Sequence, residues 1–336
     1  MMKNKITLKE LAKLLNVSVS TVSKALNDSS EISPKTIERV KELAALHNYR
    51  PNPVAVNLKS SKSGTIGVVI PNISNNFFAK VLSGIEAKAQ QEGLQVITYI
   101  SNESLEREKQ ITDMLTSGFV DGVLIAISEA THRARNYDHI FGILEYEIPV
   151  VLYDRINIDV PVDKVGIDDE KSFAEATNLL ISKGIKKIGL ASGIHHLGVG
   201  KLRIKGYESA LAEGMESMIA ASSRKQVLID GIHDILVNKK VEAVLCTDFE
   251  SAMRVYRMAY ENNIRIPEDL KMIGFLPKNV ARFLTPSISY IEQFPEEVGK
   301  NAMQMLIDRL NGKLLSDKST EKIINTELVH LESTVF

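Results

Sequence analysis

The first fifty residues contain three short stretches in which apolar residues recur at helical spacing. Their apolar faces are Leu8, Leu11, Ala12 and Leu15, then Val22, Ala25 and Leu26, and finally Ile37, Val40, Leu43 and Ala44. Each stretch follows a residue that caps helices well, namely Thr7, Ser18 and Ser33, and Pro34 fits the first position of the third helix. Thr7 and Glu10 also fit a capping box. The pattern therefore predicts three short helices, the first two joined by a very tight turn.

Two short helices joined by a tight turn and supported by a third are the outline of a helix-turn-helix, whose second helix enters the major groove of DNA. The inward-facing positions of the second helix leave four residues facing outward: Val19, Ser20, Ser23 and Lys24. Serine hydroxyls bond phosphates, and a lysine reaches a guanine edge or the backbone. The same pattern also fits an ordinary solvated face of a three-helix bundle.

The distribution of charge favours the DNA-binding alternative. The whole chain has a net charge of −1, but residues 1–62 contain eleven Lys and Arg against five acids, which gives +6 and leaves −7 for the rest. A short basic head on an acidic body indicates a polyanionic partner for the head alone.

From Thr65 onward, short apolar and β-branched runs alternate with helical patterns. The predicted strands are 66–71, 94–100, 120–127, 149–154, 186–192, 241–247 and 270–275. The predicted helices are 78–92, 105–117, 170–183 and 251–262. Continuous apolar strands that alternate with helices indicate parallel sheets covered on both faces, so the predicted fold class of the body is α/β. Ligands of such sheets bind beyond the carboxyl ends of the strands.

The composition is that of a globular protein with more than one domain. The chain has 336 residues, 44% of them hydrophobic and 25% charged, and this length suggests two or three domains. No run of about 18 apolar residues appears, and the basic, polar start lacks the apolar segment of a secretory signal. We therefore expect a cytoplasmic protein that does not associate with membranes. The single cysteine, Cys246, excludes an internal disulfide, and its apolar neighbours indicate a buried strand.

The chain lacks the signatures of an enzyme site. Neither an HExxH pattern nor a Cys/His metal spacing occurs among its histidines, which are His47, His132, His139, His195, His196, His233 and His330. His195 and His196 follow a predicted strand, and we expect them either to contact a ligand or to face solvent. Gly193, Gly198 and Gly200 form neither a GxGxxG motif nor a phosphate-binding loop. We expect no catalysis, no metal and no cofactor.

The head resembles a known family. The runs TLKELAKLLNVSVSTVSKALN at 7–27 and SPKTIERVKELAALHNYRPNPVAVNL at 33–58 are similar to the head of the lactose-repressor (LacI/GalR) family almost position for position. This resemblance implies that Val19, Ser20 and Lys24 read bases. It implies backbone contacts from Thr7, Ser18, Thr21, Ser23 and Asn27. Many members carry arginine where this chain has Lys24, which makes paired hydrogen bonds to one guanine less expected here.

The segment after the third helix resembles the hinge helix of that family, expected at 53–58. Tyr49 and Asn52 stand just before it and are among the expected DNA contacts. In the family this helix folds on DNA and wedges a leucine into the minor groove, which kinks the duplex. Leu58 matches that leucine and Ala55 the neighbouring alanine. The predicted domains are a helix-turn-helix domain at 1–52, a hinge helix and linker at 53–63, and an effector-binding core at 64–336.

The order of elements in the core resembles the two-lobed, periplasmic-binding-protein-like core of the same family. The resemblance implies one lobe at about 64–162 and 293–320, a second at about 163–292 and 321–336, three crossings between them, and an effector in the cleft. Eight residues match effector-facing positions: Asn76, Phe77, Phe78, Ser128, Asp154, Arg155, Arg203 and Asp248. Charged groups bracket sugar hydroxyls and an aromatic ring covers a sugar face. The charged residues fit surface or interlobe ion pairs equally well.

Three features depart from the family pattern. The stretch between Gly206 and Val241 is shorter than the family norm, the chain has no tryptophan, and Phe275-Leu276-Pro277 replaces an aromatic-Asp-Asp pattern. We therefore expect an unusual effector pocket and name no particular sugar.

Together these features predict a sequence-specific transcription regulator, expected to be a repressor, that binds operator DNA and is controlled by a small, sugar-like effector. A two-fold homodimer matches a pseudo-palindromic operator, and the chain ends without a leucine heptad, which favours a dimer over a tetramer. Relief of repression by an inducer is the commoner family pattern, while corepression and activation stay open. The alternative function is that of a solute-binding protein of a transport system, which shares the two-lobed fold. The basic head and the missing signal segment argue against it.

Overall fold

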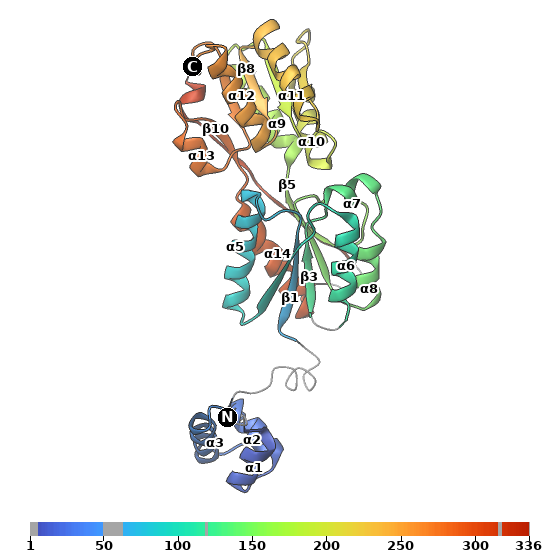
Figure 1. Cartoon of the computed structure of the whole chain (residues 1–336), viewed down its shortest axis with the longest axis vertical. Helices are drawn as coiled ribbons and strands as arrows, with labels where there is room; N and C mark the ends of the chain where they lie inside the picture. The colour runs from blue at the N-terminus through green and yellow to red at the C-terminus, as the bar shows by residue number, and fades with distance from the viewer. Residues whose placement is uncertain (1–5, 50–62, 118–119, 315–317, 336) are drawn as a thin grey trace. The chain divides into compact units, whose positions relative to one another are not determined.

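The computed structural model describes residues 6–49, 63–117, 120–314 and 318–335. The chain divides into two compact units, Met1–Ser63 and Gly64–Phe336 (Figure 1). We call them the head and the core and describe each by itself. The predicted hinge helix at 53–58 lies outside the described residues, as do Asn52, Ala55 and Leu58.

The head consists of three helices, as the sequence predicts: α1 (Leu8–Leu15), α2 (Val19–Leu26) and α3 (Pro34–Leu46). Their buried apolar side chains form one small core, which contains Leu11, Ala12, Val22, Ala25, Val40 and Ala44. The predicted capping box is present, with the Thr7 backbone N–H donating to Glu10 Oε2 at 2.7 Å and the Glu10 N–H to Thr7 Oγ1 at 3.3 Å. Asn16 ends α1 in the left-handed conformation (φ 53°), which allows α2 to begin three residues later.

The core contains two sheets, each covered by helices on both faces. The first sheet has the strand order β11-β5-β4-β3-β1-β2, and all of its strands are parallel. Its strands are β1 (Thr65–Ile70), β2 (Gln95–Ile100), β3 (Gly122–Ile125), β4 (Val150–Tyr153), β5 (Asp163–Ile167) and β11 (Glu321–Ile324). Its helices are α5 (Asn76–Gln91), α6 (Leu105–Leu115), α7 (Glu129–Ala134), α8 (Asp138–Glu145) and α14 (Pro295–Leu310). Figure 1 shows α5 and α14 on one side of this sheet and α6 and α8 on the other.

The second sheet has the order β12-β10-β9-β8-β6-β7, with only β12 antiparallel to its neighbour. Its strands are β6 (Ile188–Ser192), β7 (Met218–Ala221), β8 (Ala243–Cys246), β9 (Lys271–Gly274), β10 (Ser289–Glu292) and β12 (Glu327–Val329). Its helices are α9 (Asp169–Ser182), α10 (Gly198–Ala210), α11 (Lys225–His233) with a π-helical continuation to Asn238, α12 (Phe249–Glu261) and α13 (Lys278–Phe283). Alternating strands and helices, mostly parallel, confirm the predicted α/β class.

The chain passes between the two sheets three times, but two of the predicted lobe boundaries are wrong. We call the halves built on the first and second sheets lobe one and lobe two. The predicted boundaries put 163–167 and 321–324 in lobe two, whereas these segments are β5 and β11 of the first sheet. Lys164 pairs in register with Glu321, and Tyr153 of β4 with Val165. The chain therefore crosses after β5, between β10 and α14, and between β11 and β12.

The helices α5 and α14 cross so closely that glycine is required at the contact. A Cβ added to Gly299 would lie 2.0 Å from the carbonyl oxygen of Val81, and one added to Gly84 would lie 2.1 Å from that of Glu296. Real Cβ atoms do not approach backbone atoms so closely, so a side chain here forces the helices apart.

We expect Gly299→Ala to lower the free energy of unfolding by about 1–3 kcal/mol, the usual cost of forced overpacking. Urea denaturation of the full chain measures it. Gly142→Ala on α8 is the matched control, because no atom lies within 4 Å of its added Cβ, and alanine there should be neutral or slightly stabilising. Equal stability of the two variants would contradict the close crossing.

Candidate functional site

The outer face of α2 presents small polar side chains and one cation. Val19 is 40% exposed, Ser20 is exposed, and Ser23 and Lys24 are partly exposed. The ammonium of Lys24 pairs with the carboxylate of Glu31. Both side chains remain accessible, and an exposed pair of this kind adds only about 0–1 kcal/mol of stability, so Lys24 exchanges readily to another acceptor.

Several predicted DNA contacts also have a structural role in the head. Thr7 and Ser18 cap α1 and α2, and the Thr21 N–H donates to Ser18 Oγ at 3.0 Å. The side-chain amide of Asn27 donates to the Ser23 carbonyl at 2.9 Å. Tyr49 is half-buried and packs against the head core. Substituting any of these residues removes an interaction that stabilises the head as well as altering its surface.

A cleft between the lobes contains most of the predicted effector-facing residues. It encloses about 860 Å³ of empty space, part of it open to solvent. Seven of the eight predicted residues line it: Asn76, Phe77, Phe78, Asp154, Arg155, Arg203 and Asp248. They come from α5, the loop after β4, α10 and the start of α12, so the carboxyl ends of strands from both sheets meet here, as expected for parallel sheets.

Arg155 forms the lobe-one wall of the cleft. It is buried, and its guanidinium donates two hydrogen bonds to the Glu103 carboxylate, at 2.8 and 2.9 Å, and one to the Ile127 carbonyl at 2.8 Å. The guanidinium carbon lies 5.8 Å from the centroid of the Phe78 ring. The arginine is thus fixed in place, and its charge is compensated.

Arg203 forms the lobe-two wall. Only 5% of it is exposed, and it donates to Asp169 Oδ1 at 2.7 Å and to the Thr247 carbonyl at 2.6 Å. Its guanidinium lies 4.1 Å from the centroid of Phe275, close enough for a cation–π contact. Burial raises the pKa of Asp169, and Arg203 opposes that rise.

Asp248 caps α12 at the same wall. Its Oδ1 accepts the Ser251 N–H at 2.9 Å, and its Oδ2 accepts the Gly193 N–H at 2.8 Å and the Thr247 hydroxyl at 3.0 Å. The carboxylate therefore joins the loops after β6 and β8. A ligand hydroxyl that bonds to the Asp248 carboxylate would therefore be coupled to both loops.

The charge of Asp154 is only weakly compensated. It follows β4 in the left-handed conformation (φ 69°), and its nearest cation is Arg155, with Nε 3.8 Å from Asp154 Oδ2. Burial raises the pKa of Asp154 to about 6, Asp169 adds to the rise, and Arg155 opposes it. A buried carboxylate with this pKa gains most from ligand hydroxyl or amine donors.

We expect Asp154→Asn to stabilise the protein without ligand by up to about 3 kcal/mol at pH 7.5, while weakening effector binding. The unfolded carboxyl ionises near pH 3.9, so the folded chain binds more protons between about pH 4 and 6, and wild-type stability rises as pH falls through 6. The advantage of the variant should therefore shrink below pH 6. Urea denaturation at pH 7.5 and pH 5 measures this.

Asp113→Asn on the exposed face of α6 is the matched control for Asp154→Asn, since it makes the same chemical change outside the cleft. It should change stability little at either pH. An equal gain in both variants would mean that the environment of Asp154 is not the cause.

Ser128 does not line the cleft. It is fully buried, caps α7, and its N–H donates to Glu108 Oε2 at 2.6 Å. A hydroxyl after a strand serves a ligand or a helix equally well, and here the helix start uses it. The cleft also contains residues that the sequence analysis did not single out as ligand contacts, among them Lys80, Phe249, Phe275, Lys278, Glu292 and Gln293. Some of them carried a signal in the sequence, because Phe275 and Gln293 directly follow β9 and β10.

The described residues contain neither a reactive thiol nor a metal site. Burial raises the pKa of the Cys246 thiol, which disfavours the nucleophilic thiolate. Within 6–49, 63–117, 120–314 and 318–335, no group of three or more His, Cys, Asp and Glu side chains is arranged to hold a metal ion. Over the same ranges, no helix combines the length and apolarity needed to cross a membrane.

Comparison with known proteins identifies both parts of the chain. Residues 7–52 match the family described as bacterial regulatory proteins, lacI family, and residues 177–334 match a periplasmic binding protein-like domain. The HTH-type transcriptional regulator RegA of Clostridium saccharobutylicum is 31% identical over 337 residues, covering 98% of this chain and 99% of that protein. The chain belongs to the LacI family. It is therefore a transcription regulator with a helix-turn-helix DNA-binding domain, and neither an enzyme nor a transport solute-binding protein.

Solved structures of LacI-family proteins share the fold. The lac repressor dimer bound to operator and the anti-inducer ONPF superimposes with a TM-score of 0.85 at 20% identity, over 99% of this chain and 100% of that one. The transcriptional regulator CelR in complex with cellobiose gives 0.70 at 25% identity, over 98% and 99%. Family members bind operator DNA and small effectors.

Proposed function

We propose that this LacI-family protein is a dimeric repressor whose affinity for operator DNA is set by a small, sugar-like effector bound between the lobes. One observation carries the effector half of the proposal: seven residues chosen from the sequence line a single cleft in a chain that also has a DNA-binding head. Since operator DNA is the partner, the place of action is the cytoplasm. No metal and no cofactor enters the proposal.

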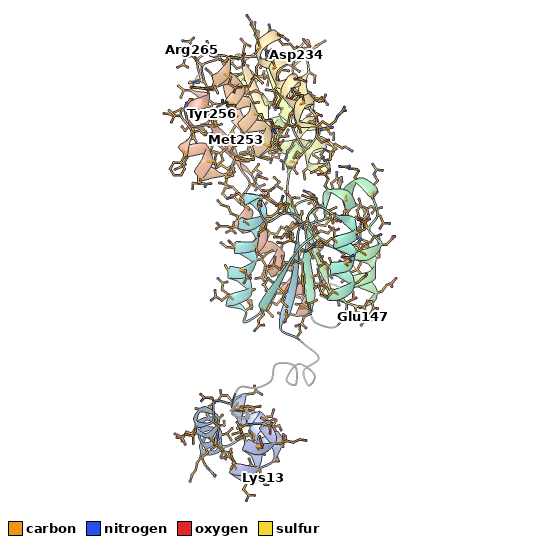
Figure 2. All side chains as sticks on the ribbon, in the orientation of Figure 1. Lys13, Glu147, Asp234, Met253, Tyr256 and Arg265 are labelled. Atoms are coloured by element: carbon orange, nitrogen blue, oxygen red, sulfur yellow. The ribbon has the colours of Figure 1, made fainter. Side chains whose placement is uncertain are left out.

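The DNA contacts are assigned to α2 and the cations around it. Val19, Ser20 and Lys24 are accessible and would reach base edges, with Thr7, Ser18, Thr21, Ser23 and Asn27 on the backbone. Tyr49 and Asn52 are expected among the DNA contacts, and Ala55 and Leu58 in the minor groove. Lys13 projects from α1 into solvent and is available to a phosphate (Figure 2). Affinity should therefore fall steeply with salt.

Dimerisation is supported by an apolar surface on lobe two. Phe249 and Tyr260 on α12 are 47% and 75% exposed, and Phe283 on α13 is 86% exposed. Met253 and Tyr256 lie between the first two along α12 (Figure 2). Aromatic and methionine side chains are enriched at interfaces, and a patch of this kind on neighbouring helices suits a self-complementary two-fold contact.

The chemistry of the cleft supports a polar ring as effector. Asp154 and Asp248 accept hydrogen bonds, Arg155 and Arg203 donate them, and Phe77 covers an apolar face. The similar regulator CelR binds cellobiose, a sugar. Leu276 and Pro277 line the cleft where the family pattern has two acids, so this pocket offers fewer acceptors and favours a less hydroxylated or substituted sugar. The effector acts by binding one arrangement of the lobes better than another.

The deciding experiment is a thermal-shift screen of the full chain against sugars, sugar phosphates and nucleosides. A ligand that binds the folded state raises the melting temperature. A sugar hit, followed by operator titration with and without it, is expected to show weaker DNA binding in its presence. Hits confined to nucleosides would overturn the sugar assignment, and a hit without any change in operator affinity would overturn effector control.

A further inference from the structure

A hydrogen bond joins the two lobes at the edge of the cleft. The backbone N–H of Gly198, the first residue of α10 in lobe two, donates to Nε2 of His132 on α7 in lobe one at 2.9 Å. No pattern in the sequence assigns a role to His132. No side chain of lobe two caps α10, since its N-cap residue is Leu197. The first turn of α10 thus takes an acceptor from the other lobe for an N–H that helices leave unpaired.

The contact requires glycine at position 198. A Cβ there would lie 2.8 Å from His132 Nε2 and 3.2 Å from Cε1 of the same ring. A larger residue would therefore displace the imidazole from the helix end. The glycine thus permits the two lobes to approach at this point.

Both sides of the contact are rigidly connected to the walls of the cleft. In lobe two, α10 also contains Val199 and Arg203, which line the cleft. In lobe one, α7 is fixed by the buried carboxylate of Glu108, which accepts the Ser128 N–H at 2.6 Å and the Thr131 hydroxyl at 2.8 Å.

A second connection on the lobe-one side runs through Glu103. Its carboxylate accepts the Glu129 N–H at the start of α7 at 2.6 Å and also receives the Arg155 guanidinium. Movement of α7 relative to α10 therefore moves Arg155 relative to Arg203, which are the two cationic walls of the cleft.

Going beyond the function proposed above, on which it rests, we propose that His132 is a positioning residue of the effector cleft: as a neutral imidazole it accepts the Gly198 N–H and holds α10 against lobe one. A protonated imidazole has donors on both nitrogens and cannot accept this bond. Nε2 is the acceptor, so the ring proton resides on Nδ1, which is buried and has no hydrogen-bond partner among the described residues. Protonation of His132 therefore releases the contact.

The surroundings of His132 oppose its protonation. Burial lowers the pKa of His132, and four nearby groups lower it further: the cations Arg155, Lys201 and Arg135, and the imidazole of His196. The nearest acid on α7 is Glu129, but its carboxylate pairs with Arg133 and lies 3.1 Å from His196 Nε2.

Four further acids share a second cavity with His132: Asp154, Asp168, Asp169 and Glu321. Asp168 caps α9, Asp169 accepts from Arg203, and Asp154 is nearest to Arg155. None of them forms a hydrogen bond to the imidazole that would favour its charged form. The joined lobes therefore hold His132 neutral.

The direction of the pH effect follows from this lowered pKa. An exposed histidine ionises near pH 6.5, so separated lobes bind a proton that joined lobes do not. The contact is complete above that pH and is lost as the pH falls through and below it. For one proton the balance shifts by up to tenfold per pH unit. Asp154 titrates in the same range, so a variant at position 132 must isolate the histidine.

The test is hydrogen exchange of the Gly198 amide in the full-length protein without added ligand, resolved by mass spectrometry of fragmented peptides. His132→Ala should exchange this amide at least tenfold faster than wild type at pH 7.5. His132→Gln retains a neutral acceptor, so the ratio of the wild-type rate to its rate should rise as pH falls from 7.5 to 5.5. His195→Gln is the matched control and should follow wild type, because His195 makes no bond to Gly198.

A double-mutant cycle separates positioning from a general loss of structure. Gly198→Ala should accelerate exchange in amides that follow on α10 when His132 is present, and much less in the His132→Ala background, since the clash is then gone. Wild-type exchange in His132→Ala, or the same pH profile in wild type and His132→Gln, would overturn the proposal. The measurement needs no effector, so its outcome is independent of whether the screen identifies one.

Discussion

Replacing Arg203 by methionine is expected to abolish the effector response and to lower the free energy of unfolding by about 3–5 kcal/mol. The loss is large because the variant leaves Asp169 buried without its cation, and breaking a buried pair from one side carries this cost. Asp169 is 3% exposed and loses the hydrogen bond from Arg203 Nε. Urea denaturation gives the stability, and operator titration with the effector found by the screen gives the response.

The double variant Asp169→Asn, Arg203→Met separates stability from function. It removes the stranded carboxylate, so most of the lost stability should return, while the response stays absent because the donor in the cleft is gone. In both variants operator affinity without effector should remain, since the head is a separate compact unit. A normal effector response in the double variant would show that Arg203 has no part in binding.

The sequence was sufficient to predict the location of a side chain where that location depends only on its position after a strand. Parallel strands bring their carboxyl ends to one edge, and the family resemblance assigned Asp154, Arg155 and Asp248 to the cleft there without knowledge of the packing. The three head helices were also predictable, because each has its own cap and its own apolar stripe.

Where the role depends on a distant partner, the sequence was insufficient. Asp163 and Lys164 at the start of β5 do not look like a buried strand, yet Arg309 binds the Asp163 carboxylate at 2.6 and 2.9 Å and Lys164 donates to the Ile158 carbonyl at 2.6 Å. These partners compensate the polar groups of Asp163 and Lys164, so the segment forms strand β5 of the first sheet and the lobe boundary lies after it. Ser128 is a second example. The sequence assigned its hydroxyl to the ligand, but Glu108, twenty residues away, accepts the Ser128 N–H and fixes the residue outside the cleft.

The positions that the sequence did not reveal are mostly those where the lobes meet. His132 belongs to a short helix that no pattern predicted, and its partner is a backbone N–H rather than a side chain. The charge of each arginine in the cleft walls is compensated by an acid of its own lobe: Arg155 pairs with Glu103, and Arg203 pairs with Asp169. Direct bonds across the cleft are therefore few, so a ligand that bonds to both walls can shift the balance between arrangements with modest energy.

Lys24→Ala is expected to weaken specific operator binding by about tenfold to 100-fold, the usual worth of a lysine or arginine that reads a base. A base contact predicts relaxed discrimination at one operator position with little change in non-specific binding, whereas a phosphate contact predicts uniform weakening and a salt slope reduced by about one. Titration of operator variants at several salt concentrations distinguishes the two. Lys41→Ala on α3 is the matched control, because it removes the same charge from the head at a residue that pairs with Asp28. If Lys41→Ala costs as much specificity as Lys24→Ala, the effect belongs to the net charge of the head and α2 is not the reading helix.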